Sequence, residues 1–245
     1  MRYFNYNEDL EFILTEETEV TFEKHNHISK YVAGIVLNGT LKIEENDRTI
    51  VCHCDDIFII PIYSVHSLHL NHPSIRLLTM CVGIPFINQY SLNEAREILV
   101  HNTNELQKLN IIDGKKASAF EDALDLIFTL YHEQKLVFPE PINEINQLII
   151  NNPQGQLDLE SLAKRIYISK YYMIRKFKEN IGLTPHNFQI QNRIRRAQYL
   201  LGEGWTVIDV AVELGFYDQS HFVKSFKYYV GLTPSEYIHS LEKLN

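Results

Sequence analysis

The same twelve-residue pattern occurs twice in this chain, and the repeat constrains the fold more than any other feature. The first copy, FKENIGLTPHNF, begins at Phe177, and the second, FKYYVGLTPSEY, begins at Phe226, 49 residues later. Six of the twelve positions are identical. Each copy places Gly182 or Gly231 where a helix ends in a left-handed residue, and Thr-Pro then supplies an N-cap and a first helical residue. The repeat therefore predicts a duplicated helical unit.

The residues around each copy predict two helix-turn-helix units, at about 141–183 and about 206–232. A good N-cap residue stands before each of the paired helices: Asp158, Ser169, Thr206 and Asp218. A linker helix is expected between the units, from Pro185 to about Leu201, and is roughly 25 Å long at 1.5 Å per residue. The second helix of such a unit can enter the major groove of DNA.

The net charge of −8 looks unsuited to nucleic acid, but the charge is unevenly divided along the chain. Residues 1–140 carry 11 Lys and Arg against 21 Asp and Glu, whereas residues 141–245 carry 12 against 10. Nine basic residues and one acidic residue fall within 164–196. This division favours an acidic module joined to a nucleic-acid-binding module, although a solvated basic helix face would look the same.

The first half of the chain has a different pattern. Upstream of residue 90, short β-rich runs are separated by the turn signals Asn38-Gly39 and Asn46-Asp47. Helical spacing follows, with one apolar stripe made of Phe120, Ala123, Leu124, Ile127, Phe128 and Tyr131. The prolines of LVFPEPINE favour a domain boundary, so we expect one domain at 1–138 and another at 139–245. Beyond residue 141 only helices are expected.

The composition excludes some classes of protein. No apolar run approaches about 18 residues, so a membrane span is not expected. The first residues, MRYFNYNEDLEF, lack the apolar core of a signal peptide. The three Cys are an odd number, which favours reduced thiols in the cytoplasm over a disulfide framework.

The second half resembles the AraC/XylS family of bacterial transcription regulators. The resemblance is carried by LAKRIYISKYYMIRKFKENIGLTPHNF, by RIRRAQYLL and above all by IDVAVELGFYDQSHFVKSFKYYVGLTPSEY. Family members bind double-stranded DNA with two helix-turn-helix units in one chain, joined by a central helix. The resemblance therefore implies promoter DNA and RNA polymerase as partners.

The resemblance also indicates which side chains face DNA. In the first recognition helix these are Lys170, Tyr171, Ile174 and Arg175, and in the second Gln219, Ser220, His221 and Lys224. Arg175 is the best candidate for a bidentate contact to guanine, whereas Ile174 departs from the polar residue common at its position. Phosphate contact or simple solvation is expected for Lys176, Lys178, Arg195 and Lys227. Arg193 is expected to hold the linker helix.

The first half resembles, in FEKHNHISKYVAGIVLNGTLKI and CDDIFIIPIYSVHSLHL, the cupin-like sensing domain found ahead of this DNA-binding region in many family members. The resemblance implies an α+β fold of two domains: a small β-barrel followed by helices, then an all-α domain with two helix-turn-helix units. The barrel is expected to bind a small effector, with His25, His27, Tyr31 and His66 converging on its cavity. The helical stripe packs on this barrel or forms a homodimer contact.

A metal site is an alternative use of the same region. His25, His27 and His66, with Cys52 and Cys54, are candidate ligands for a soft divalent metal. The Glu that follows the His pair in enzymatic cupins is missing, and Tyr31 or Val32 stands near its place. We therefore expect a regulator without a metal cofactor and without enzymatic activity. A metal-responsive regulator, a metal-dependent cupin enzyme, and a barrel that responds to a protein partner stay open.

Overall fold

The computed structural model describes residues 1–7, 9–16, 20–45, 48–70, 74–133 and 137–243, which form two compact units. The first unit comprises Met1–Lys135 together with Ser240–Asn245, and the second comprises Leu136–His239. The expected division lay at 138/139 and placed the end of the chain in the second domain. The expected α+β class, with a β domain followed by a helical domain, is confirmed.

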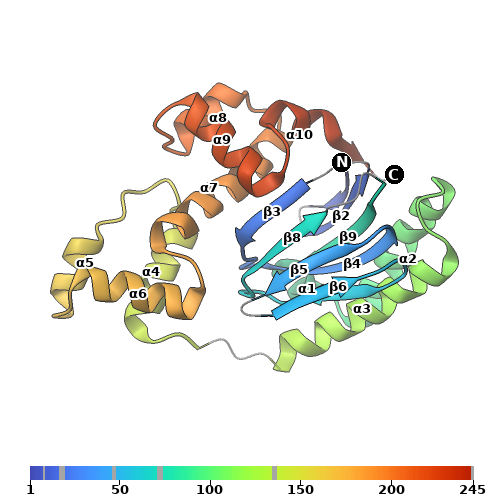
Figure 1. The fold of residues 1–245 in the computed structure, drawn as a ribbon, viewed down its shortest axis with the longest axis horizontal. Coiled ribbons are helices and arrows are strands. Elements are labelled where there is room, and N and C mark those ends of the chain that lie inside the picture. The colour runs from blue at the N-terminus through green and yellow to red at the C-terminus, as the bar shows by residue number, and fades with distance from the viewer. Residues whose placement is uncertain (8, 17–19, 46–47, 71–73, 134–136, 244–245) are drawn as a thin grey trace. The chain divides into compact units, whose positions relative to one another are not determined.

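The first unit is built on two sheets that face each other. Among the described residues, one sheet has the order β10-β1-β2-β9-β4-β7 and the other has the order β3-β8-β5-β6 (Figure 1). The strands are β1 (Arg2–Asn7), β2 (Leu10–Glu16), β3 (Val20–His25), β4 (Lys30–Asn38), β5 (Leu41–Glu45), β6 (Arg48–Cys52), β7 (Ile57–Ile60), β8 (His66–Leu70), β9 (Arg76–Gly83) and β10 (Leu241–Lys243).

Apolar side chains fill the space between the two sheets. Val36 of β4, Ile43 of β5 and Leu68 of β8 belong to this core. On β4, Gly34 lies opposite Phe58 of β7, and a Cβ added at this glycine would approach the phenylalanine ring to 2.2 Å. The Phe58 ring therefore occupies the place that a side chain at position 34 would need.

Helices cover the face of the six-stranded sheet that points away from the second sheet. They are α1 (Ile84–Gln89), α2 (Leu92–Lys108) and α3 (Gly114–Glu133). In α3 the expected apolar stripe packs against this sheet and is buried except at the partly buried Tyr131. Within it, Phe120 meets Phe12 of β2 edge to face with ring centroids 5.7 Å apart. The stripe thus packs on its own barrel, which decides between the two roles that its spacing allowed.

The second unit consists of helices over its described residues. They are α4 (Glu140–Asn151), α5 (Leu159–Arg165), α6 (Lys170–Ile181), α7 (Pro185–Gly202), α8 (Val207–Glu213), α9 (Gln219–Val230) and α10 (Pro234–Ser240). Helix α7 packs against α4 and α6 of the first helix-turn-helix and against α8 and α9 of the second. None of the helices in the described ranges is long and apolar enough to cross a membrane.

Local chemistry explains where these helices begin and end. Asp158, Ser169, Thr184, Thr206 and Asp218 each accept a hydrogen bond from a backbone N–H in the first turn of α5 to α9. The repeated glycines after α6 and α9 adopt the left-handed conformation, with φ of 85° at Gly182 and 81° at Gly231. Both follow the expected pattern, because an L-residue would be strained there.

The end of the chain differs from the expectation of helices alone. Strand β10 pairs in parallel with β1, with Leu241 opposite Tyr3. This pairing places the residues after α10 in the first unit. A three-residue strand is too short to show an alternating apolar pattern, so the sequence carried no local signal for it.

Candidate functional site

The first recognition helix, α6, presents a polar face away from its core. Met173 and Phe177 are buried. Of the four residues expected to face DNA on this helix, Lys170, Tyr171 and Arg175 are exposed, and Ile174 is half-buried. The exposed face of α6 therefore carries two cations and one aromatic ring, and these side chains could meet base edges in the major groove of DNA.

The second recognition helix, α9, repeats this arrangement. Phe222 and Phe226 are fully buried and their rings meet at 5.7 Å. All four residues expected to face DNA on α9 are exposed: Gln219, Ser220, His221 and Lys224. The His221 ring also contacts Phe216 of the preceding turn, with ring centroids 5.4 Å apart. Each helix-turn-helix thus buries the apolar face of its second helix and exposes the polar face.

Arg175 already has partners within its own helix. Its Nε lies 3.7 Å from Oε1 of Glu179, and its guanidinium lies over the ring of Tyr172 at 5.4 Å. Lys176 also pairs with Glu179, through Nζ and Oε2 at 2.7 Å. These contacts are exposed, so they compete weakly with a nucleic-acid phosphate or base. Arg175 can leave them for a stronger bidentate partner.

Two exposed tyrosines that the sequence did not single out lie beside the recognition helices. Tyr167 and Tyr217 precede α6 and α9, and their side chains are 97% and 92% exposed. Tyr167 also has a φ of 57°. In the matching turn of the second helix-turn-helix, Gly215 adopts the same left-handed conformation, with a φ of 67°. A left-handed tyrosine is strained, and such strain concentrates at functional sites. Only the comparison of the two turns, at the second residue after α5 and after α8, signals this position.

Arg193 has the holding role expected of it. From α7 its guanidinium donates to the backbone carbonyls of Pro153 at 2.8 Å, Gln154 at 3.3 Å and Gly215 at 2.8 Å. The first two residues precede α5, and Gly215 lies in the turn between α8 and α9. One side chain therefore ties the linker helix to both helix-turn-helix units.

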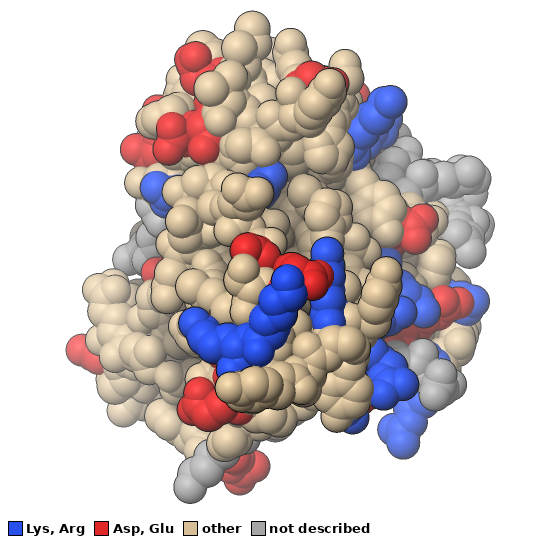
Figure 2. All heavy atoms as spheres, turned by 90° about the vertical axis from the view of Figure 1, so that its left-hand side faces the viewer, with Lys and Arg blue, Asp and Glu red and all other residues tan. Residues whose placement is uncertain are grey.

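Basic side chains gather near the first recognition helix. Figure 2 looks at the left-hand side of Figure 1, where α5 and α6 lie, and shows Lys and Arg grouped there around a few acidic residues. Among the residues expected at phosphates, Lys178 and Lys227 are exposed, whereas Lys176 is half-buried. Arg195 is half-buried and its Nη1 lies 3.4 Å from Oδ1 of Asn192, which gives it a structural contact as well.

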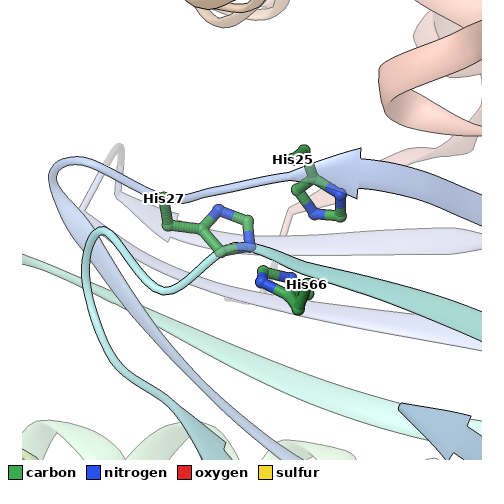
Figure 3. A group of neighbouring side chains, drawn as sticks. All are labelled: His25, His27 and His66. Atoms are coloured by element: carbon green, nitrogen blue, oxygen red, sulfur yellow. The ribbon is translucent and has the colours of Figure 1, made fainter. Parts of the chain in front are cut away.

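Three histidines meet at one end of the barrel. His25 ends β3, His27 lies in the loop after that strand, and His66 begins β8 (Figure 3). The ring centroids are 4.3 Å apart for His25 and His66, 5.1 Å for His25 and His27, and 5.2 Å for His27 and His66. A register shift in the β3–β8 ladder lies just before the His25–His66 pair, and such a bulge redirects side chains.

Hydrogen bonds fix the tautomers of two of these rings. Nδ1 of His25 lies 2.6 Å from the carbonyl oxygen of Glu23, and Nδ1 of His66 lies 3.0 Å from that of Ser64. A carbonyl oxygen only accepts, so each Nδ1 carries the proton and each neutral ring keeps a lone pair on Nε2. Burial lowers the pKa of His66, against the opposing effects of the Ser64 carbonyl and the Glu45 carboxylate. His66 is therefore neutral at pH 7.

The other residues expected at this site lie elsewhere. Tyr31 is fully buried on the opposite face of β4, in the core beneath the helices, and burial raises its pKa. Cys52 belongs to the core between the sheets, whereas Cys54 is exposed and its thiol donates to the carbonyl of Leu37. Neither thiol joins the histidines, and over the described residues the three histidines alone form a group with metal-ligand spacing.

Comparison with known proteins decides the family. The family model of the AraC-like ligand binding domain matches residues 9–139, which is more than half of the chain, and a helix-turn-helix domain matches residues 162–240. The chain belongs to the AraC family. The sequence resemblance to AraC/XylS regulators is thus confirmed.

Three transcriptional regulators show how similar this chain is to its relatives in sequence and in length. An uncharacterized HTH-type transcriptional regulator of Haemophilus influenzae is 32% identical over 123 residues, 46% of this chain and 41% of that protein. The regulator YbfI of Bacillus subtilis is 28% identical over 228 residues, 82% of this chain and 81% of its own. With the regulator SACOL0084 of Staphylococcus aureus the match spans 34% of that protein. This chain thus covers less than half of two of these relatives.

The same two-domain fold occurs in a solved structure. ToxT from Vibrio cholerae superposes with a TM-score of 0.61 at 14% sequence identity, over 96% of this chain and 98% of that one. At this identity the likeness concerns the fold, which pairs a β domain with helices.

Proposed function

We propose that this AraC-family protein regulates transcription by binding double-stranded DNA through α6 and α9, in response to an effector bound by its first unit. The observation that carries the proposal is the duplication itself. Two second helices have matched N-caps, buried aromatic residues and exposed polar faces, and one linker helix holds both units. Such a chain reads two successive segments of major groove, as a symmetric dimer does elsewhere.

Within this proposal the exposed residues divide into two roles. Arg175 and Lys224, with the polar side chains beside them, contact base edges, because they lie on the outer faces of the two recognition helices. Lys178 and Lys227, near the ends of α6 and α9, contact phosphates and fix the register. Tyr167 and Tyr217 contact the sugar-phosphate backbone from the turns.

The first unit supplies the sensing half of the proposal. Its match to a ligand-binding domain and the polar group of three histidines at one end of the barrel support a small effector there. ToxT has been solved with an unsaturated fatty acid bound, which is consistent with effector binding in this fold. RNA polymerase and a second copy of the chain are further proposed partners. The α3 stripe is buried within the first unit, so a dimer would use another surface.

The DNA-binding test uses the full chain and the DNA that flanks its own gene. We expect Arg175→Ala and Lys224→Ala each to weaken specific binding about fivefold to 150-fold, equivalent to roughly 1–3 kcal/mol for a lost base contact. Lys115→Ala, at an exposed lysine of α3, is the matched control and should bind like the parent protein. Parental affinity in both recognition-helix variants would remove α6 and α9 from the interface.

A salt titration provides a second reading of the same interface. Binding through phosphates releases counterions, so the logarithm of the association constant should fall linearly with the logarithm of salt concentration. Lys178→Ala should make this slope shallower by about one contact and weaken all DNA sequences alike. An unchanged slope would place Lys178 outside the phosphate contacts.

A further inference from the structure

We propose that His25, His27 and His66 bind one divalent transition-metal ion at the end of the barrel and leave a coordination position open. The sequence favoured an organic effector, because the carboxylate of enzymatic cupins is missing. The arrangement of the three rings changes that balance. Their ligand atoms all lie within 4.8 Å of one another, and the three imidazoles point toward a shared space (Figure 3).

Small movements of the rings would bring their nitrogens to the spacing of a filled site. Nitrogen ligands lie about 2.0–2.1 Å from zinc, so two of them in a tetrahedral site are about 3.4 Å apart. The ligand atoms all lie within 4.8 Å of one another, so the widest pair must close by at most about 1.4 Å. His27 lies in a loop and is half-buried, so rotation of its ring can supply the movement.

The surroundings of two rings match those of metal-bound histidines. A histidine ligand usually donates its other ring N–H to a carbonyl or carboxylate, which fixes the ring and its tautomer. His25 and His66 both donate Nδ1–H to a carbonyl, from Glu23 and Ser64 respectively, which leaves Nε2 as the lone-pair nitrogen of each ring. The orientation of a metal ligand is therefore already built for two of the three.

The buried Nε2 of His66 carries the argument furthest. His66 is 1% exposed, and among the described residues its Nε2 is buried without a hydrogen-bond partner. Leaving a buried polar atom unsatisfied costs about 1–3 kcal/mol, so native structures seldom retain one without a reason. A metal ion that accepts this lone pair supplies the missing partner.

The ligand set indicates the class of metal. Three neutral imidazoles without a thiolate or carboxylate suit Zn²⁺, Co²⁺, Ni²⁺ or Cu²⁺, whereas Mg²⁺ and Ca²⁺ require oxygen ligands. Three protein ligands leave a position for water or for an anionic group of an effector. A bound ion would join the end of β3, the loop after it and the start of β8. Any effect on DNA affinity depends on the proposed regulatory function, but metal binding itself does not.

The experiment titrates the metal-free full chain with Co²⁺ and follows visible absorption. We expect one equivalent to bind and to produce the intense d–d bands of a four- or five-coordinate ion. His27→Ala should weaken binding by at least about a hundredfold, since loss of a supporting contact alone costs 10–100-fold. His25→Ala should act alike. His53→Ala removes an exposed histidine outside the group and should leave binding unchanged.

The outcomes separate the site from the function. The parent protein is itself decisive, because a spectrum of weak octahedral bands or the lack of saturation at one equivalent overturns the site without reliance on any variant. Equal binding by the His25, His27 and His53 variants, with folding checked by circular dichroism, also overturns it. DNA binding by the same preparations is measured in parallel. Metal binding without DNA binding would contradict the proposed function alone, and the reverse would contradict the metal site alone.

Discussion

At the scale of single residues, Arg193 lies in a basic region of the chain, but its charged group has a structural role. Burial lowers its pKa, and its guanidinium donates to three backbone carbonyls. We expect Arg193→Lys to lower the free energy of unfolding by roughly 1–3 kcal/mol, because a compact ammonium cannot reproduce this fork of donors. Denaturant unfolding measures the change. Arg196→Lys, at an exposed arginine of the same helix, should be close to neutral.

The three cysteines differ in environment and should differ in reactivity. Burial raises the pKa of Cys81 to about 12 and also raises the pKa of Cys52, whereas Cys54 is exposed. We expect a thiol reagent at pH 8 to label one cysteine per native chain, since the thiolate is the reactive form. Denatured protein should react at all three. Rapid labelling of Cys81 in the native state would contradict the buried placement.

The Cys81 pKa also gives a direction for alkaline stability. The folded state holds this proton more tightly than the unfolded state, whose thiol has a pKa near 9.0. The contribution to stability is therefore complete below pH 9 and falls as pH rises toward about 12. In a Cys81→Ala variant, the loss of unfolding free energy between pH 9 and 11 should be smaller than in the parent chain. An identical pH slope in both proteins would show that this thiol does not contribute.

At the scale of elements, the sequence predicted helix ends far better than strand faces. Ser169, Asp218 and the two repeated glycines act within one turn of their own position, so their chemistry is readable locally. Tyr31 could not be placed in this way. Its face on β4 depends on pairing with β7 and β9, and those partners are distant in sequence.

The histidine group shows the same limit. His25 and His27 do not lie on one strand, because β3 ends at His25 and the loop after it brings His27 back to the group. The pairing of His25 with His66 follows a register shift that no local pattern signals. Sequence therefore supplied the residue types of the site, and the ladder between β3 and β8 supplied its geometry.

Gly34 tests the packing between the two sheets. An added Cβ would meet the ring of Phe58 at 2.2 Å, inside the core. We expect Gly34→Ala to lower the melting temperature, with a destabilisation of roughly 1–3 kcal/mol from overpacking. Gly202→Ala is the matched control, because that glycine ends α7 and a Cβ there meets nothing within 4 Å. A neutral Gly34→Ala would mean that Phe58 moves aside without cost.

At the scale of the whole molecule, charge and topology divide the chain differently. The first 140 residues carry a net −10 from 11 basic and 21 acidic residues, and the remainder carries +2 from 12 and 10. The sequence showed this division directly. It did not show that the chain, after leaving α10, adds β10 beside β1 in the first unit. Pairing between the two ends of a chain is the least local interaction possible, so only the folded structure reveals it.

The structure of the second unit predicts how strictly the protein requires one distance between its two DNA half-sites. Helix α7 spans Pro185–Gly202, and Arg193 fixes it to the turn of one helix-turn-helix and to the segment before the other. The two recognition helices are therefore held at one separation and one relative orientation. On the proposed function, we expect the protein to read two major-groove segments one helical turn apart, about 10 base pairs.

Insertion of DNA between the two half-sites tests this rigidity. We expect an insertion of about 5 base pairs to abolish specific binding, because half a helical turn moves one segment to the opposite side of the duplex. An insertion of about 10 base pairs restores the face but not the distance, so a rigid pair of helix-turn-helix units should bind this DNA no better than the shorter insertion. A flexible pair of units would instead recover full affinity at 10 base pairs. Electrophoretic mobility shifts on the three DNA spacings distinguish these outcomes, and Arg193→Lys should make the protein more tolerant of the altered spacing if that arginine sets it.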